Sequence, residues 1–416
     1  MNEVWIIDAA RTPRGIGKVG KGALADIHPQ RLLSTVLKSL QERNNLNTAD
    51  VDDVIAGCGS QVGKQSQCIA RMAALDAGWD DQATGFSLDR FCGSGMTAVN
   101  LGMMGIMSGQ QDLVVAGGVE SMSYGMSQSQ NPLMPPTQDS GNTHLREIHP
   151  IPHQGVCADV IATLEGITRE ECEELSLESQ RRADIAIKEG RFDKSVVPVY
   201  KDDGSLALDK EEFPRPNTTQ ENLAALKPAF TDLVNYPLDE EGLTYKKLVE
   251  ATYPDLEINH IHHAGISSGV VDGAAAVVLA SPEYAKANGL KPRARILAVE
   301  NAGCEPELML NAPVLAAQKC AKRAGINIED IDLFEVNEAF AVVPIKFMRD
   351  LGINPDKVNV NGSAMALGHP IGATGAILVG TLLDELERQN LKTGMATLCA
   401  GGGMAPAIII ERMDAV

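Results

Sequence analysis

The second half of the chain repeats the pattern of strands and helices found in its first half. "LSTVLKSLQERNNLNTADVDDVIAGC" aligns with "VLAAQKCAKRAGINIEDIDLFEVNE" at an offset of roughly 280 residues, which pairs Asp52 with Asp332. The same offset pairs "CGSG" at 92–95 with "GATG" at 372–375, and a slightly larger one pairs "VVAGGV" with "LCAGGG". Chance similarity between two α/β segments would explain any single match. Three matches in the same order favour an ancient duplication of one α/β unit.

Strand-like runs alternate with helix-like segments in both halves, which predicts an α/β fold with largely parallel strands. The segment from Gly95, "GMTAVNLGMMGIMSG", is apolar on nearly every face, and its counterpart "TGAILVGTLLDEL" is largely apolar in its first turns. A helix that is apolar all round is buried all round. We therefore expect the two helices to pack against each other between two sheets, with their N-termini close together and further helices outside.

The middle of the chain has a different character and divides the sequence into three parts. Residues 121–262 are polar and contain Pro- and Met-bearing stretches, with one clear amphipathic helix that begins at a Thr168/Glu171 capping box. A long insertion of this kind is usually a lid or a binding subdomain. The expected division is a first half at 1–120, completed by about 263–285, an inserted loop domain at 121–262, and a second half at 286–416.

Charge and composition exclude several classes of protein. With 36 basic and 55 acidic residues the net charge is −19, which argues against nucleic acid or an anionic membrane as partner. No run approaches the roughly 18 apolar residues of a membrane span, and neither end resembles a targeting signal. Eight cysteines without a C-x-x-C pair indicate reduced thiols. The expectation is a cytoplasmic protein.

Cys92 is the strongest candidate nucleophile. In "LDRFCGSGMTAV" it follows a strand and begins a buried helix, where the helix N-terminus is expected to stabilise a thiolate and lower its pKa. Glycines at 93 and 95 allow another group to approach the backbone. The alternative is a buried structural cysteine, which the strand-Cys-Gly-x-Gly-helix setting disfavours.

Three more residues in the second half could complete a catalytic set. His369, in "ALGHPIGATG", could take the thiol proton, because the duplication places it on the twofold-related side of the same centre; a turn histidine is the alternative. Cys399 ends a strand before three glycines whose N–H groups suit an oxyanion. Asn337, in "EVNEAFA", could orient a water or a carbonyl, or else cap the following segment. Such a set suits acyl transfer through a thioester with carbanion or enolate chemistry.

Six ordered motifs then point to a family: "DRFCGSGMTAV", "AGGVESMS", "SSGVVDGAAAV", "VNEAFA", "NVNGSAMALGHPIGATGA" and "CAGGGMA". Together they cover nearly the whole chain, which resembles a thiolase, an acetyl-CoA acyltransferase. The resemblance implies a five-layer αβαβα fold built from two duplicated halves, with an inserted loop domain that grips coenzyme A.

The resemblance also assigns roles to matching residues. Cys92 would accept the acyl group and His369 would activate it. Cys399 would deprotonate the α-carbon of acetyl-CoA, or protonate it in the cleaving direction. Asn337 would hold a water that forms one oxyanion hole with His369, and the N–H groups of Cys92 and Gly401 would form the other.

For the substrate, the resemblance points to Ser268 and His153 along the pantetheine arm of CoA, and to Lys227 near its nucleotide end. The expected partners are acetyl-CoA, other acyl-CoAs and CoA itself, with no tightly bound cofactor, no metal and no nucleic acid. The family implies a homodimer or a homotetramer.

The predicted reaction is condensation of two acetyl-CoA to acetoacetyl-CoA, or the reverse thiolytic cleavage of a 3-ketoacyl-CoA. A longer-chain 3-ketoacyl-CoA thiolase of fatty-acid β-oxidation is one alternative, and a non-catalytic CoA-binding protein is another. A ketoacyl synthase on the same fold would lack the second catalytic cysteine, so the motifs favour a thiolase.

Four features depart from the family pattern or from ordinary loops. Gln154 stands where the family usually has methionine beside the acyl pocket, and the segment 231–266 is longer than usual, so acyl-chain preference stays open. "NHIHH", with His260, His262 and His263, has metal-like spacing but no nearby carboxylate or cysteine pattern, which favours a polar loop. The N-terminal "RTPRGIGKVGKG" is expected to be a solvated basic loop, with attraction of anionic CoA as the less favoured alternative.

Overall fold

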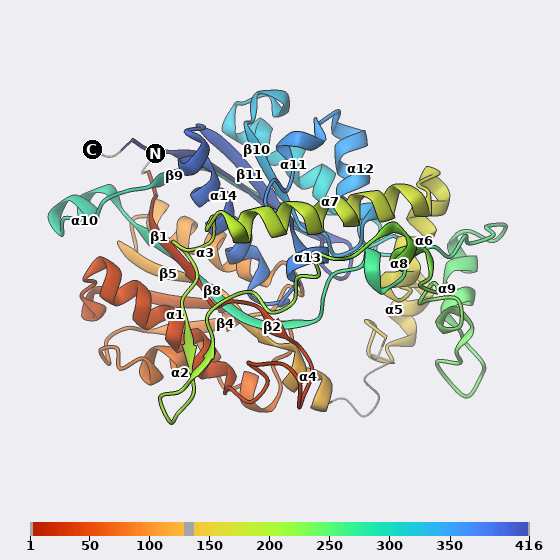
Figure 1. Ribbon diagram of the computed structural model, residues 1–416, viewed down its shortest axis with the longest axis horizontal. Helices are drawn as coiled ribbons and strands as arrows, with labels where there is room; N and C mark the ends of the chain where they lie inside the picture. The colour runs from red at the N-terminus through yellow and green to blue at the C-terminus, as the bar shows by residue number, and fades with distance from the viewer. Residues whose placement is uncertain (1–2, 129–136, 415–416) are drawn as a thin grey trace.

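The computed structural model describes residues 3–128 and 137–414 (Figure 1). The first half supplies strands in the spatial order β4 (Gly85–Leu88), β3 (Asp53–Gly57), β5 (Leu113–Ser121), β8 (Val271–Ala280) and β1 (Trp5–Arg11). The second half supplies β10 (Leu333–Val336), β11 (Thr393–Thr397), β12 (Met404–Arg412) and β9 (Ala294–Gly303). The two sheets meet where β1 pairs antiparallel with β9 over two residue pairs.

The order of strands shows the duplication directly. β3, β5, β8 and β1 occupy the same successive positions as β10, β11, β12 and β9, with the same sense of pairing at each step. Single side chains repeat as well: Asp52 accepts hydrogen bonds from the N–H groups of Asp112 and Leu113, and Asp332 accepts them from Lys392 and Thr393. Two halves that share their strand order and these loop contacts derive from one unit.

The expectation of largely parallel strands is wrong. Parallel pairing joins β3 to β4 and β5, and β10 to β11, whereas the remaining pairs along the main path are antiparallel. β11 and β12 are linked by the short turn Gly401–Gly403, and such a turn joins only antiparallel neighbours. The apolar start of the segment "VNVNGSA" forms a single parallel bridge, between Phe334 and Val358.

The two central helices pack against each other, as predicted. They are α3 (Ser94–Met107) and α14 (Thr374–Gln389), and their buried side chains share one core with both sheets. Their N-termini touch closely: a Cβ atom on Gly375 would lie 2.0 Å from the backbone nitrogen of Met96. Burial is not complete, because Leu101 and Met104 of α3 are exposed.

Outer helices complete five layers. α1 (Pro29–Asn44) and α2 (Ile69–Asp76) cover the outer face of the first sheet, and α11 (Ala312–Ala324) and α12 (Val342–Leu351) cover that of the second. This is the expected αβαβα arrangement. Shorter elements are β2 (Gly15–Ile16), which pairs with β8, α4 (Met122–Gln128), α10 (Pro282–Ala287) and α13 (Ala364–Leu367).

The described part of residues 121–262 forms a mainly helical region. It contains α5 (Thr143–Ile148), α6 (Gln154–Glu165), α7 (Arg169–Lys188), α8 (Gln220–Ala224), α9 (Tyr245–Thr252) and a hairpin of β6 (Val199–Tyr200) with β7 (Leu206–Leu208). In Figure 1 its helices α5, α6, α8 and α9 lie at one end of the molecule, and α7 runs from that end across the middle. The predicted Thr168/Glu171 capping box is present at the start of α7. Part of the predicted loop domain, residues 129–136, lies outside the described residues.

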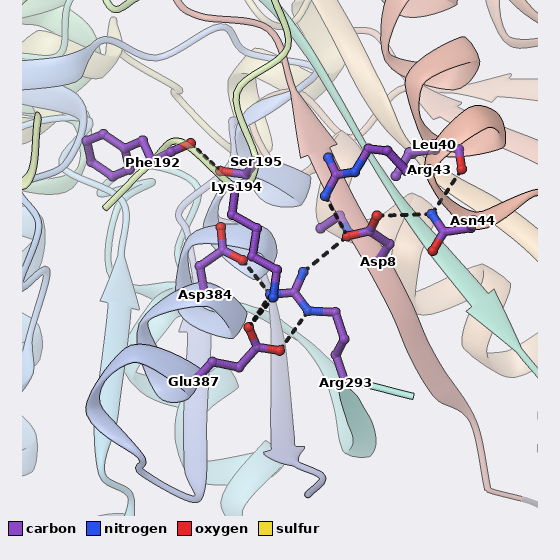
Figure 2. A network of polar contacts seen from close by, with 11 residues as sticks. Asp8, Leu40, Arg43, Asn44, Phe192, Lys194, Ser195, Arg293, Asp384 and Glu387 are labelled. Atoms are coloured by element: carbon purple, nitrogen blue, oxygen red, sulfur yellow. Dashed lines mark hydrogen bonds and ion pairs between the residues drawn. The ribbon is translucent and has the colours of Figure 1, made fainter. Parts of the chain in front are cut away.

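Arg293, just before β9, ties the halves together (Figure 2). Its guanidinium contacts Asp8 of β1 at 3.2 Å, and Asp384 and Glu387 of α14 at 2.6 Å each. These carboxylates raise the pKa of Arg293, which keeps the side chain charged despite its burial. Asp8 also accepts hydrogen bonds from Arg43 and Asn44 of α1, so one cluster joins both sheets to a central and an outer helix.

Replacing Arg293 by methionine is expected to lower the free energy of unfolding by about 3 kcal/mol or more, because buried carboxylates lose their counter-charge. Urea-induced unfolding followed by circular dichroism measures the change. Arg181→Met is the matched control: its side chain is 60% exposed, and its pair with Glu178 should be worth less than about 1 kcal/mol. Equal losses in both variants would contradict a structural role for the Arg293 cluster.

Candidate active site

A tight turn between β4 and α3 presents Cys92. Phe91 adopts a left-handed backbone conformation (φ 49°), and its N–H donates to the Asp89 carboxylate at 2.7 Å. Ser94, the first residue of α3, fastens the turn, since its hydroxyl accepts from Arg90 N–H at 2.8 Å and donates to the Phe91 carbonyl at 2.6 Å. The turn thus places a half-buried thiol at the helix N-terminus, as the sequence predicted.

The prediction of a lowered pKa for Cys92 is wrong for the resting protein. Burial, together with the nearby carboxylate of Glu120, raises the pKa of Cys92 to about 12. Removing a thiolate from water costs more free energy than its attraction to the helix N-terminus provides. Cys92 therefore rests as a neutral thiol and needs a base to take its proton when a substrate is attacked.

Asn337 and Cys399 lie side by side at the ends of neighbouring strands. Asn337 follows β10, Cys399 follows β11 after one residue, and the two strands run parallel, with Asn337 N–H donating to the Thr397 carbonyl at 3.2 Å. Both polar atoms of the Asn337 carboxamide are buried and have no hydrogen-bond partner among the described residues. Burial raises the pKa of Cys399, with the nearby Cys92 sulfur adding to the effect, so this thiol also rests protonated.

His369 occupies the turn before α14. Gly368 supplies a backbone conformation (φ 94°) that side chains rarely adopt, and His369 N–H donates to the Gly269 carbonyl at 2.9 Å. Burial, assisted by the positive charge of Arg14, lowers the pKa of His369 to about 4. The imidazole is therefore neutral at physiological pH, and its Nε2 atom is buried without a partner in the described part of the chain.

Close backbone contacts bring these turns together. A Cβ on Gly95 would lie 2.6 Å from the carbonyl oxygen of Gly372, so the Cys92 turn abuts the turn after His369. A Cβ on Gly401 would lie 2.9 Å from the ring of Phe91, which puts the glycine run after Cys399 against the same turn. Cys92, His369, Cys399, Asn337 and Gly401 thus converge where the duplicated halves meet.

The three predicted CoA residues are placed differently. Ser268 belongs to the cluster, because its N–H donates to the carbonyl of Ala339 at 2.9 Å and its neighbour Gly269 binds His369. His153 caps α6 and contacts the ring of Phe230 at 5.6 Å. Lys227 lies exposed in the loop after α8.

Two features of the site were missed in the sequence. Phe230 and Phe340 form an aromatic series with His153 beside the Asn337 segment, at 5.6 and 6.1 Å between ring centroids. Phe340 is part of "VNEAFA", but nothing local in the sequence connects Phe230 to it. The other feature is Glu120.

Glu120 of β5 joins the two halves beside the reactive thiol. Its carboxylate accepts from the N–H groups of Gly59 and Ser60 on one side and from Gly372 on the other, at 2.8 to 3.1 Å. The side chain is fully buried, and burial raises its pKa. The only sign of Glu120 in the sequence was its place in the motif "AGGVESMS". The fold was needed to show that this strand of the first half reaches the turn that carries His369.

The "NHIHH" histidines are held by carboxylates from distant helices, which the sequence pattern did not reveal. Asp159 of α6 contacts His260 at 2.7 Å and His262 at 2.8 Å, and Glu173 of α7 contacts His263 at 3.1 Å. His262 and His263 are fully buried, so this polar loop packs inside the protein. Within the described residues, no group of three or more His, Cys, Asp or Glu side chains is placed to hold a metal ion.

The N-terminal basic segment is only partly solvated, contrary to expectation. Arg11 and Arg14 are buried and pair with Glu211 at 2.6 and 2.9 Å, while Lys18 and Lys21 are exposed. These contacts hold the pKa of Glu211 at about 2, well below its usual range, despite burial. The cluster therefore fastens β1 to the inserted region and places a positive charge near His369.

The low pKa of His369 predicts an unusual pH dependence. Protonation of His369 would remove the base and stop acetylation. Because the pKa of His369 is about 4 instead of the usual 6.5, activity should be lost only at a lower pH. The rate at which acetyl-CoA acetylates the protein in a first turnover should stay nearly constant from pH 7.5 to about 5.5. Quench-flow mass spectrometry after brief pH jumps measures this, with tryptophan fluorescence as the control for folding. A fall centred above pH 6 would contradict a neutral buried imidazole.

Comparison with known proteins agrees with this geometry. Residues 4–233 match the family model "Thiolase, N-terminal domain", and residues 290–412 match "Thiolase, C-terminal domain". An acetyl-CoA acetyltransferase of Chromobacterium violaceum is 40% identical over 99% of this chain and 100% of its own length. A steroid 3-ketoacyl-CoA thiolase of Mycobacterium tuberculosis is 39% identical over 99% of this chain and 95% of its own.

Further relatives have different substrates in their names. A beta-ketoadipyl-CoA thiolase of Pseudomonas aeruginosa is 38% identical, with 99% of both chains covered. The crystal structure of a Bacillus anthracis acetyl-CoA acetyltransferase superposes with a TM-score of 0.82 at 36% identity, covering 99% of each chain. No helix among residues 3–128 and 137–414 has the length and apolar character to cross a membrane. From its fold, its family matches and its relatives, the chain belongs to the thiolase family and is a CoA-dependent thiolase enzyme.

Proposed function

We propose that this thiolase transfers an acyl group from an acyl-CoA to Cys92 and then passes it to the α-carbon of acetyl-CoA, or runs the same steps backwards as thiolysis. One observation carries the proposal most strongly. Two thiols converge at one point of the fold with an imidazole nitrogen and a carboxamide that have no partner among the described residues. A single transfer would need only one thiol, whereas carbon–carbon bond formation needs a second group that exchanges a proton with carbon.

The first half-reaction uses Cys92 and His369. The Cys92 sulfur bonds to the thioester carbonyl carbon while its proton passes to the Nε2 atom of His369. The carbon–sulfur bond to CoA breaks, and the leaving sulfur takes that proton. The N–H groups of Cys92 and Gly401 stabilise the oxyanion that forms in between, a contribution typically worth about 3–4 kcal/mol per donor.

The second half-reaction uses Cys399 and Asn337. In condensation, Cys399 first passes its thiol proton to His369 and then, as a thiolate, takes a proton from the α-carbon of acetyl-CoA. The carbanion attacks the acyl carbon on Cys92, the carbon–sulfur bond to Cys92 breaks, and the Cys92 thiolate takes the proton back from His369. In thiolysis, the protonated resting thiol of Cys399 supplies a proton to the departing acetyl carbanion. The Asn337 carboxamide, with His369, stabilises the enolate oxygen through a water.

Ser268 and His153 flank the route by which the pantetheine arm would reach the two thiols, and Lys227 on the surface would attract the CoA phosphates. Burial lowers the pKa of His153 to about 4, so it would contact the arm as a neutral ring. CoA and its thioesters act here as substrates, and the reaction needs no further cofactor in this scheme. We place the protein in the cytoplasm on its composition.

Acetyl and acetoacetyl groups are the proposed acyl substrates. The packed rings of His153, Phe230 and Phe340 lie beside Asn337, and in this scheme they would act as a wall that limits the length of the acyl chain. The side chain of Gln154 is exposed, so it does not by itself set the chain length. The alternative, a longer-chain 3-ketoacyl-CoA thiolase, is favoured only by the long segment 231–266.

Thiolysis of acetoacetyl-CoA against 3-ketoacyl-CoAs of increasing chain length tests the proposed substrate. We expect kcat/KM to be greatest for acetoacetyl-CoA and to fall as the chain grows. A kcat/KM that rose with chain length would support the longer-chain 3-ketoacyl-CoA thiolase instead. Absence of thiolysis with every member of the series would refute the proposed reaction itself.

We further propose a homodimer as the minimum assembly, alone or paired into a homotetramer. β4 is an edge strand, and Phe86 on it lies exposed, as do Leu101 and Met104 of α3. An apolar edge of this kind favours pairing with a second copy. Light scattering that gave a monomer at micromolar concentration would contradict this assembly. The three-part division predicted from the sequence remains our proposal for the domains.

A further inference from the structure

The hydroxyl group of Thr374 makes two hydrogen-bond contacts that together fix the direction of its proton. Its hydroxyl oxygen lies 2.5 Å from the Nδ1 atom of His369 and 2.9 Å from the carbonyl oxygen of Pro370. Both contacts are buried. Thr374 is the first residue of α14, so its hydroxyl sits at the start of a central helix.

The chemistry of the three groups leaves one consistent arrangement. A carbonyl oxygen can only accept, so the single hydroxyl proton is donated to Pro370. Toward His369 the hydroxyl oxygen must then accept, and the Nδ1 atom must carry a proton. A neutral imidazole has only one ring proton, so Nε2 is left with a free lone pair.

The geometry points to Thr374 as the positioning residue that fixes the proton of His369 on Nδ1 and leaves Nε2 to act as the base. This inference rests on the proposed reaction, in which Nε2 takes the Cys92 proton. The Nε2 atom is buried and unpartnered in the described part of the chain, as an atom awaiting a substrate-linked proton would be. In the opposite tautomer, an Nε2–H group could not accept anything from the thiol.

The duplication explains how this hydroxyl came to be available. Ser94 stands at the equivalent first position of α3 and uses its hydroxyl in the same double way, accepting from Arg90 N–H and donating to the Phe91 carbonyl. In the first half the accepting side of the hydroxyl shapes the nucleophile turn. In the second half the hydroxyl oxygen of Thr374 accepts from the imidazole of His369 instead of from a backbone N–H group.

Proton transfer then proceeds without any change at Thr374. The Cys92 proton moves to Nε2 as the sulfur–carbon bond forms, which gives an imidazolium with both nitrogens protonated. The Nδ1–H bond to Thr374 strengthens, because a charged donor binds its acceptor more tightly. When the CoA sulfur leaves, Nε2 returns its proton, and the original tautomer is restored.

Two variants of nearly equal size test the assignment. Thr374→Val keeps the shape but removes the hydroxyl, and Thr374→Ser keeps the hydroxyl. We expect Thr374→Val to slow acetylation of Cys92 by acetyl-CoA about 10- to 100-fold, the usual cost of losing an orienting partner, with little change in KM. Thr374→Ser should restore the rate. An unchanged rate in folded Thr374→Val would overturn the proposal.

The tautomer itself is measured by nitrogen-15 NMR of histidine-labelled enzyme, with His369 assigned through a His369→Gln variant. We expect Nε2 of wild-type His369 to show the shift of an unprotonated nitrogen, and Thr374→Val to lose this single-tautomer signature. A protonated Nε2 in the wild type would overturn the proposal even if Thr374→Val fails to fold. Because the resting enzyme is measured without substrate, this result is independent of whether Cys92 is acetylated, which tests the proposed function separately.

Discussion

Replacing Cys92 by alanine is expected to abolish acetylation of the protein by acetyl-CoA and to lower kcat for thiolysis by about 10⁴-fold or more, because the covalent intermediate can no longer form. Peptide mass spectrometry should find an acetyl group on Cys92 in the wild-type enzyme and on no peptide of the variant. The fold should survive, since the thiol is only half-buried and packs at the margin of the central core, so its loss leaves no large buried cavity.

Cys68 provides the matched control for this experiment. It is an exposed thiol at the start of α2, so Cys68→Ala removes an accessible sulfur without touching the site. Full activity is expected in that variant. An acetyl group that remained on the protein after Cys92 was replaced would assign the nucleophile to another residue.

Replacing Cys399 by alanine should separate the two half-reactions. Acetylation of Cys92 is expected to persist, because the first transfer needs only Cys92, His369 and the oxyanion donors. Condensation and thiolysis should fall by about 10³-fold, within the usual range for loss of a general acid or base. Quantifying the acetyl-enzyme by mass spectrometry beside a steady-state thiolysis assay measures both quantities.

The control for Cys399 is another buried thiol. Cys320 of α11 is fully buried and donates to the Ala298 carbonyl, so Cys320→Ala creates a comparable small cavity away from the site. Loss of activity to the same degree in both variants would mean that packing, not proton transfer, explains the effect. Loss of acetylation in Cys399→Ala would show that its proposed role is wrong.

The architecture could be predicted from the sequence where the signal was periodic or repeated. The match of Asp52 with Asp332 and the all-apolar pattern of two helices led to the correct central layer, because burial on every face leaves few packing solutions. Strand direction could not be predicted, because apolar strands read alike in either sense and only the connection determines direction. The place of β8 in the first half was predicted from the sequence, but its antiparallel sense was not.

In the candidate site, too, the sequence predicted features that depend on neighbouring residues but not those that depend on residues far away in the chain. Cys92, His369 and Cys399 were selected because each stands at a strand or helix end with glycines nearby, and Asn337 because it ends a strand with a carboxamide. The ionisation of Cys92 and the anchoring of Arg11, Arg14 and the "NHIHH" histidines depend on groups far away in sequence, such as Glu120, Asp159 and Glu211. Local sequence cannot report a counter-charge supplied by another element.

The contact between the starts of α3 and α14 also limits how this molecule can change. A side chain at Gly375 would meet the backbone of Met96, and a backbone cannot rotate out of the way as a side chain does. Any residue larger than glycine there would act as a wedge and shift the turn that carries His369 away from the turn that carries Cys92. The spacing between base and nucleophile therefore depends on the absence of a side chain at Gly375.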